Sequence, residues 1–475
     1  MSRRARVAAI VSVGVFVASL DLFIVNIAFP DMERDFAGTS LASLSWVLNA
    51  YAIVFAALLV PAGRWADRVG RKRAFLGGLA VFTLASAACA ASPSVEFLIG
   101  ARVVQAAGAA LLMPASLGLM LPEFPAEKRG MALGLWAAVG GTAAAAGPVI
   151  GGLLVELSWR WVFLVNLPVG LFAIVAGARV LGEIRETGAA KPDTLGSAIL
   201  TGAVGTLVGA IVQGPDWGWT SGRVLALFVV AVALSIAFAV RSGRVEVPVV
   251  EPELLRVRAF AASNAAGVLF FIGFAAMLLG SVLFLTEVWG ESALTAGLMI
   301  SPGPTMAALF AVGSGALSGK IGPRAMGAMG TVLFGIGGLL FATRLGAEPH
   351  YVSDYLPGML VGGAGVGFVN PALAGAATAQ LPPTRLATGS AVLTMARQLG
   401  SALGIAILVA VVGTPSPADA VDAFRDAWWL MVAAGAGATI AFLAVGPLAR
   451  PAIAPTREEE LEAAAIAMAP EIASL

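Results

Sequence analysis

The chain has 475 residues, of which 59% are hydrophobic and 12% are charged, and its formal net charge is +1. A soluble globular protein does not have this balance, so the composition predicts a protein that crosses a membrane many times. The net charge gives no electrostatic basis for binding nucleic acid. Because the chain has one cysteine, Cys89, and one histidine, His350, it can form no internal disulfide, no Cys/His metal cluster and no histidine relay.

At roughly 20 residues per crossing, the apolar runs allow about fourteen helices. A closed barrel would show short alternating strands, and these runs do not alternate. The first run follows MSRRAR and no small-residue cleavage site comes after it, so we expect a retained first helix rather than a signal peptide. The first six predicted helices cover residues 7–29, ending at Pro30, and then 45–63, 74–91, 95–120, 131–157 and 161–181.

Two further helices are predicted at residues 195–213 and 224–240, and the polar residues 242–260 are expected to form a cytoplasmic linker along the membrane surface. The last six predicted helices cover residues 262–285, 294–317, 325–344, 356–379, 390–412 and 427–445. We therefore predict four parts: an N-terminal six-helix half (1–182), a central segment with two extra helices and a linker (183–260), a C-terminal six-helix half (261–449) and a cytoplasmic tail (450–475).

The stretch between the second and third predicted helices, residues 63–73, reads GRWADRVGRKR and is strongly basic. A short basic loop between spanning helices stays in the cytoplasm, so this stretch predicts the orientation of the whole chain. An even number of helices then places both termini in the cytoplasm. Of the 29 lysines and arginines, the outer loops receive only Arg34, Arg160, Arg223, Arg344 and Arg425.

We expect the same stretch to act as a cytoplasmic gate, in which Asp67 and the following arginines pair across the cytoplasmic face. Alternatively, its cations are only topology signals. The candidate gate residues are Gly63, Asp67, Arg68, Gly70 and Arg71. A second copy, GALSGKIGPR at residues 315–324, indicates two repeated halves, the usual plan of secondary transporters. It has Gly319 in place of the acid, so its gate is expected to be weaker.

Asp21 is the strongest candidate for a functional residue, because it lies deep in the first predicted helix between Leu20 and Leu22. An acid at such depth costs free energy and is by default functional. A carboxylate that binds a proton facing one side and releases it facing the other is the least that a proton-driven transporter needs. The structural alternative is that Asp21 pairs permanently with a cation or caps a broken helix.

Arg102 is the second charge predicted to be buried, early in the fourth helix within RVVQAAGAA. A buried arginine needs an acceptor, and Asp21 is the leading candidate, so that a pair sensitive to protonation would couple proton binding to helix movement. Alternatively, Arg102 bonds backbone carbonyls and only holds its helix. Gln105 and Met113 follow on the same face and are candidates for lining the cavity.

The fifth predicted helix contains GPVIGG, with Gly147, Pro148, Gly151 and Gly152. A stripe of small residues favours close helix packing, and Pro148 bends the helix by removing a backbone hydrogen bond. The stripe consists of Gly140, Ala144, Gly147 and Gly151. We interpret these features as a pliable seam between the two halves. Generic glycine-rich packing is the alternative.

Other candidates lie near the far end of the chain or at the rim. Arg397 and Ser401 share a face of the helix at residues 390–412 and are candidates for lining the cavity, with helix packing as the alternative. Glu287 and Glu156 lie near outer helix ends, where a rim position is expected and a second titrating site is the alternative. The chain has no phosphate-binding loop and no catalytic constellation, so we expect neither an ATP-driven pump subunit nor an enzyme.

These motifs together resemble the fourteen-helix drug:proton antiporter branch of the major facilitator superfamily. The similar segments are LDLFIVNIAFP, GRWADRVGRKR, RVVQAAGAA, GPVIGG, SWRWVFLVNLPVG and MARQLGSALG. The resemblance implies an all-α fold of two six-helix halves plus two extra central helices. It also implies that Asp21 and Arg102 couple protons, that Asp67 and its arginines form the gate, and that residues 147–152 form the antiport seam.

The chain departs from the branch in three places. Ala106 replaces a usual glycine of the fourth helix, and Gly319 removes the second gate acid. The helix at residues 390–412 lacks the acid that some cation-exporting relatives use, which argues against dicationic substrates.

We therefore predict a monomeric inner-membrane exporter that exchanges protons for amphipathic organic compounds, as in multidrug efflux and antibiotic resistance. Its expected partners are small-molecule substrates, protons and the lipid bilayer, with no metal and no cofactor beyond the proton gradient. One alternative is a dedicated exporter of a single metabolite or natural product. Uptake by symport is disfavoured by the helix 5 motif by analogy, and a non-transporting sensor or scaffold has no need of a buried titrating acid.

Overall fold

The computed structural model describes residues 2–125, 128–186, 191–382 and 385–446. Every regular element in those residues is helical, because a chain in lipid must satisfy its backbone N–H and C=O groups within each segment. Fourteen helices of the described chain are long and apolar enough to span a membrane. The predicted class and number of helices are therefore confirmed.

Six spans make up the first predicted half. They are α1 (Arg3–Asp35), α2 (Leu41–Val69), α3 (Arg71–Ala90), α4 (Val95–Met120), α5 (Arg129–Val155) and the short α6 (Trp161–Leu164) continued by α7 (Asn166–Val180). The 3-10 turn η1 (Leu121–Glu123) follows α4. The two extra spans are α8 (Thr194–Trp217) and α9 (Gly222–Ser242), and the short α10 (Pro252–Arg256) lies in the linker.

The second half contains longer and more irregular elements. They are α11 (Arg258–Leu283) continued by the π turn η3 (Phe284–Val288), α12 (Ala293–Ile300), α13 (Pro302–Arg344), the π turn η4 (Tyr351–Tyr355) continued by α14 (Leu356–Thr378), α15 (Leu386–Val412) and α16 (Ala420–Leu443). α13 belongs to two spans, because Gly322 interrupts it with φ +76°.

Two predicted boundaries are wrong. The first helix does not end at Pro30 but continues through it to Asp35, because a proline costs a membrane helix one hydrogen bond that its surroundings can replace. Residues 63–73 are not a loop, since α2 runs to Val69 and α3 begins at Arg71. Only Gly70 leaves the helical conformation, with φ +120°, which favours a residue without Cβ.

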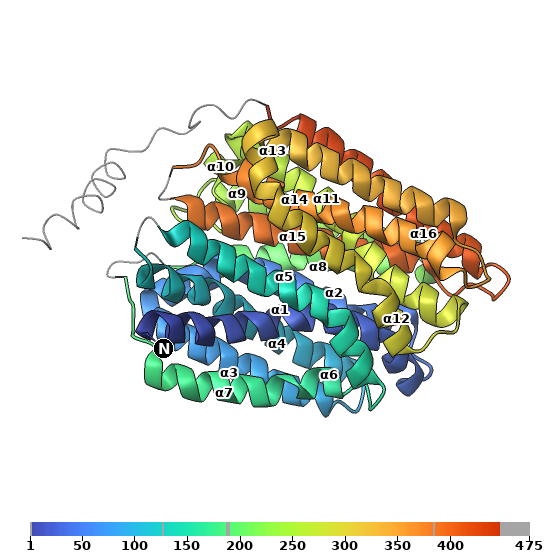
Figure 1. Cartoon of the computed structure of the whole chain (residues 1–475), viewed down its shortest axis with the longest axis horizontal. Coiled ribbons are helices and arrows are strands. Elements are labelled where there is room, and N and C mark those ends of the chain that lie inside the picture. The colour runs from blue at the N-terminus through green and yellow to red at the C-terminus, as the bar shows by residue number, and fades with distance from the viewer. Residues whose placement is uncertain (1, 126–127, 187–190, 383–384, 447–475) are drawn as a thin grey trace, which may run out of the picture.

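The predicted halves meet along a small set of helices. α2 packs along α15, and α5 packs along α12. α8 lies against both α2 and α15, whereas α9 packs mainly on α8. Figure 1 shows the helices of the first half, in blue to green, on one side of the bundle and those of the second half, in yellow to red, on the other.

Candidate functional site

Asp21 and Arg102 form an ion pair inside the first half. Asp21 lies on α1 and Arg102 on α4, and their exposed fractions are 0% and 1%. Arg102 Nη1 lies 2.5 Å from Asp21 Oδ2. Arg102 also donates from Nε to the carbonyl oxygen of Val47 on α2, at 3.1 Å. The structure thus brings together the two residues that the sequence singled out, and it adds a backbone acceptor.

Gln105, one turn beyond Arg102, completes a closed set of hydrogen bonds. Its Oε1 accepts from Arg102 Nη1 at 2.7 Å, and its Nε2 donates to Asp21 Oδ1 at 2.9 Å. The same Nε2 donates to Ser86 Oγ on α3 at 2.7 Å. Each charged group therefore has hydrogen-bond partners, which a buried ion pair needs to offset the cost of desolvation.

Several members of this network were not predicted. Asn166 on α7 donates from Nδ2 to Ser86 Oγ at 3.2 Å and to Asp21 Oδ1 at 3.4 Å. Tyr51 on α2 places its ring 4.1 Å from Arg102 Cζ, in a cation–π contact. A polar side chain inside an apolar span was the available signal for Asn166, which lies within SWRWVFLVNLPVG. Residues of five helices, α1, α2, α3, α4 and α7, thus meet in the network around the Asp21–Arg102 pair.

This arrangement can respond to a proton. The carboxylate of Asp21 accepts hydrogen bonds from three side chains, those of Arg102, Gln105 and Asn166. Protonation removes the negative charge that balances the guanidinium and leaves a buried cation without its counter-ion. Because an uncompensated buried charge is strongly destabilising, proton binding at Asp21 would favour a rearrangement of the helices that carry the pair.

The predicted gate residues contact one another, α4 and the first residues of the central segment 183–260. Asp67 Oδ1 accepts from Arg71 Nε at 2.7 Å across the break at Gly70. Arg71 Nη1 donates to the carbonyl oxygen of Gly118 on α4 at 3.1 Å. The backbone of Arg68 accepts from Arg185 Nε at 2.7 Å. In this conformation Asp67 therefore pairs inside its own motif and not across the cytoplasmic face.

A neighbouring arginine of the same stretch reaches the linker instead. Arg64 Nη1 donates to the carbonyl oxygens of Val247 and Pro248 at 3.1 and 2.7 Å. Glu251 lies 3.5 Å from Arg64 and 3.7 Å from Arg385, which precedes α15. Gly63 lies against α4, where an added Cβ atom would lie 3.3 Å from Pro114 Cβ. The linker thus contacts charged groups of both predicted halves.

The glycines of α5 face two different helices. A Cβ atom on Gly147 would lie 2.6 Å from Phe23 Cβ, and one on Gly151 would lie 3.1 Å from Ile24 Cγ1, both on α1. A Cβ atom on Gly152 would lie 2.6 Å from Leu294 Cα on α12. The predicted stripe therefore packs within the first half. The neighbouring face of α5, which carries Pro148 and Gly152, contacts α12 of the second half instead.

The remaining predicted residues lie apart from the Asp21 network. Met113 is half-buried on α4, and its carbonyl oxygen accepts from Ser116 at 2.6 Å. Ser401 Oγ donates to the carbonyl oxygen of Arg397 at 3.1 Å, within α15. Glu156 and Glu287 are exposed, the latter on the π turn η3. Their exposure agrees with the expected rim positions.

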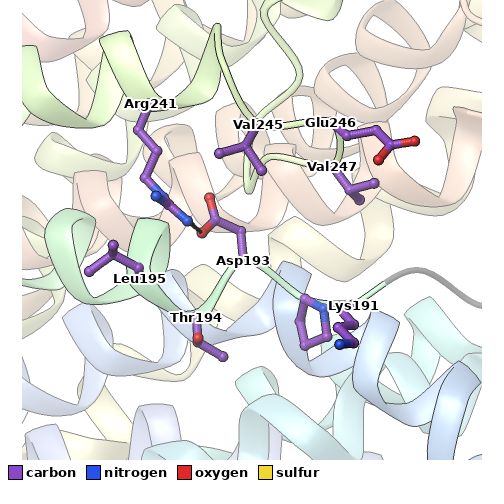
Figure 2. A pocket seen from close by; sticks show the side chains of 9 residues that line it. Lys191, Asp193, Thr194, Leu195, Arg241, Val245, Glu246 and Val247 are labelled. Atoms are coloured by element: carbon purple, nitrogen blue, oxygen red, sulfur yellow. Dashed lines mark hydrogen bonds and ion pairs between the residues drawn. The ribbon is translucent and has the colours of Figure 1, made fainter.

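A cavity of about 540 Å³ lies near the start of α8 and the end of α9, lined by residues 191–195, 241 and 245–247. Figure 2 shows Arg241 and Asp193 pointing toward each other there, with Arg241 Nη2 2.7 Å from Asp193 Oδ1. Asp193 also caps α8 by accepting from the backbone N–H of Gly196 at 2.8 Å. No predicted site residue lines this cavity. The described residues contain no group of three or more His, Cys, Asp or Glu side chains that could hold a metal ion.

The profile of the Major Facilitator Superfamily matches residues 11–405, and the helical bundle agrees with it. A solved peptide transporter structure, POT in complex with sulfate, superposes with a TM-score of 0.68 at 16% identity, covering 93% of this chain and 95% of that one. The chain belongs to the Major Facilitator Superfamily, which is a family of transporters and not of enzymes.

Several proteins that the chain resembles in sequence are named for resistance or export. The methylenomycin A resistance protein of Streptomyces coelicolor is 34% identical, covering 91% of this chain and 87% of the relative. The tetracenomycin C resistance and export protein of Streptomyces glaucescens is 33% identical, covering 88% and 77%. The multidrug resistance protein Stp of Mycobacterium tuberculosis is 32% identical, covering 84% and 74%. The chain is therefore a multi-pass membrane transporter similar to antibiotic and drug exporters.

Proposed function

We propose that the protein is a proton-coupled exporter of amphipathic organic compounds, antibiotics among them, that works by alternating access. The observation that carries the proposal is the fully buried Asp21–Arg102 pair with its three further hydrogen-bonding side chains, Gln105, Ser86 and Asn166. A membrane interior holds an ionisable pair at a cost, and such pairs mark ion pathways. The names of the relatives support resistance by export.

The proposed cycle uses the pair as a switch. A proton from outside binds Asp21 and releases Arg102 from its counter-ion, and the helices that carry the two groups move so that the site faces the cytoplasm. Release of the proton inside and binding of substrate restore the opposite orientation. The two moving bodies are residues 1–182 and 261–449, which meet where α2 contacts α15 and α5 contacts α12.

The proposal includes the inner membrane as the location, both termini in the cytoplasm and a monomer as the transporting unit. The strongly basic residues 63–73 support the orientation through the positive-inside rule. A dedicated exporter of one natural product is the second candidate, because two of the three relatives are named after single antibiotics. The contacts of the Asp21 network are compatible with an exporter of many compounds and with an exporter of one.

Proteoliposomes with an acidic lumen and a trapped pH-sensitive dye test the proposal. Addition of amphipathic cations, neutral drugs or anions outside should raise the lumenal pH as protons leave in exchange for substrate. Asp21→Asn should abolish this signal. Asp193→Asn is the matched control, because Asp193 is also buried and paired with an arginine but lies outside the network. Equal rates of proton efflux for Asp21→Asn and the native protein would mean that Asp21 has only a structural role. The absence of a pH signal with every compound would contradict export of a broad range of drugs.

A further inference from the structure

We propose that Arg397 on α15 binds the anionic group of an aromatic substrate, which assigns organic anions as a preferred cargo. The inference rests on the proposed export function. Arg397 lies about 17 Å along α15 from its first residue, so it is deep inside the span Leu386–Val412. Its guanidinium Cζ lies 4.6 Å from the centroid of the Phe271 ring on α11.

Arg102 shows how this chain accommodates an arginine inside a span. Its guanidinium stacks on the Tyr51 ring at 4.1 Å and also has the Asp21 carboxylate and two further acceptors, the Gln105 side chain and the Val47 carbonyl. Arg397 has a comparable aromatic contact but has neither a carboxylate partner nor a hydrogen-bond acceptor in the part of the chain that the structure describes. Among the described residues, no carboxylate lies within salt-bridge distance of Arg397, and its side chain donates no hydrogen bond.

A guanidinium has five N–H donors and keeps its charge in proteins. In a membrane interior such a group faces a partner or a water-filled space, because exposure to lipid is too costly. Arg397 is partly buried, and its donors have no acceptor among the described residues. Gln398, the next residue, has its side-chain nitrogen buried without an acceptor. Two successive residues of α15 therefore carry side-chain donors that lack acceptors among the described residues.

Close packing fixes the position of the aromatic partner. A Cβ atom on Gly400 would lie 3.0 Å from Phe271 Cβ, so α15 and α11 approach closely at this level. The Phe271 ring also contacts the rings of Phe270 and Phe274, with centroids 5.3 and 5.5 Å away. A guanidinium stacked on a ring leaves its N–H edge free to hold a carboxylate with two hydrogen bonds. Of the three rings, that of Phe274 is partly exposed, and we expect it to contact the apolar ring of the same ligand.

The charges of the second half favour an anion. The acids of its described spans, Glu287, Asp354, Asp422 and Asp426, lie toward the span ends, whereas Arg397 lies near the middle of its span with no counter-ion among the described residues. α15 also packs along α2 of the first half, so a ligand on Arg397 lies beside the contact between the halves. Exchange of one inward proton for one outward monoanion moves two charges in the same sense. Export of an anion should therefore depend more steeply on membrane potential than export of a neutral compound.

Three probes with the same ring system test the charge preference: 2-naphthoate, 2-naphthamide and (2-naphthyl)methylammonium. Binding is measured by equilibrium dialysis against the full-length protein in lipid nanodiscs. We expect the naphthoate to bind about tenfold more tightly than the amide, as hydrogen bonds to a charged partner predict, and the ammonium to bind most weakly. Comparable Kd values for the naphthoate and the amide on the native protein would overturn the inference without any variant.

Variants then assign the preference to one residue. Arg397→Gln should equalise the naphthoate and the amide, and Arg397→Lys should retain part of the difference. Arg160→Gln is the matched control, because Arg160 also stacks on an aromatic ring, that of Trp159 at 4.4 Å, but pairs with Asp35. An unchanged ratio of naphthoate to amide affinity in a monodisperse Arg397→Gln protein would overturn the assignment to Arg397.

The lumenal-dye assay with the same probes separates the two proposals. If the naphthoate binds more tightly than the amide but neither moves protons, proton-coupled export would be contradicted and the anion site supported. Proton-coupled transport that treats the naphthoate and the amide alike would contradict the anion site and leave the export function standing.

Discussion

Gln105 Nε2 donates to Asp21 Oδ1 at 2.9 Å, while Gln105 Oε1 accepts from Arg102 at 2.7 Å. One amide thus contacts both members of the buried ion pair. Because an amide has a donor end and an acceptor end, it matches the anion on one side and the cation on the other. Gln105 therefore links Asp21 and Arg102 a second time, beside their direct contact.

Replacement of Gln105 by leucine should impair both stability and coupling. The substitution leaves Arg102 and Ser86 each short of a partner, at a cost of about 1–3 kcal/mol per buried group. We expect a lower Tm for the purified protein and a slower substrate-induced rise in lumenal pH. Gln213→Leu is the control, because Gln213 lies on α8, outside the network. A native rate of proton movement in Gln105→Leu would contradict the assigned role.

Asn166→Ala should have a smaller effect than Gln105→Leu. Asn166 donates at 3.2 Å to Ser86 and at 3.4 Å to Asp21, and long hydrogen bonds are weak. We expect a loss of stability of about 0.5–1.5 kcal/mol and a partial reduction in the rate of proton release. Comparison of the two variants in the same assay provides the ranking. A larger defect in Asn166→Ala would place the main proton contact on α7 instead of α4.

The contact between α5 and α12 should not tolerate a larger residue in place of Gly152. Gly152→Ala places a methyl group 2.6 Å from Leu294 Cα, and overpacking of this kind costs about 1–3 kcal/mol. We expect a lower Tm and slower transport. Gly141→Ala is the control on the same helix, where an added Cβ atom has no neighbour within 4 Å. Equal behaviour of the two alanine variants would show that the close approach on the Gly152 face is not required.

Asp67→Asn should separate stability from transport. Asp67 and Arg71 are partly exposed, at 32% and 26%, so loss of their pairing should change stability by less than about 1 kcal/mol. If Asp67 takes part in the gate, the transport rate should nevertheless fall several-fold. Asp31→Asn is the control, because Asp31 pairs with Arg34 at 2.9 Å at the opposite end of the bundle. A native transport rate in Asp67→Asn would mean that the acid serves only local structure.

The sequence by itself was sufficient for the class of protein, the number of spans and the residues of highest interest. Apolar runs of sufficient length identify spanning helices because a helix satisfies its own backbone groups in lipid and the remaining cost of insertion depends on the side chains of that segment. Asp21 and Arg102 stood out for the same reason, since each is a charge within an apolar run. Boundaries were less well predicted. A helix that leaves the hydrocarbon no longer needs apolar residues, so α2 extends to Val69 and α1 passes through Pro30.

Only the tertiary structure decided which groups meet. Ser86, Asn166 and the carbonyl of Val47 come from three different helices, and nothing local in the chain predicts how those helices are rotated about their axes. The same rotation decided that Gly147 and Gly151 face α1 whereas Gly152 faces α12, because successive helical residues point about 100° apart. It also placed Asp21 beside Arg102 and left Arg397 without a carboxylate partner in the part of the chain that the structure describes. The sequence identifies charges that need partners, and the packing of the helices determines which of them find one.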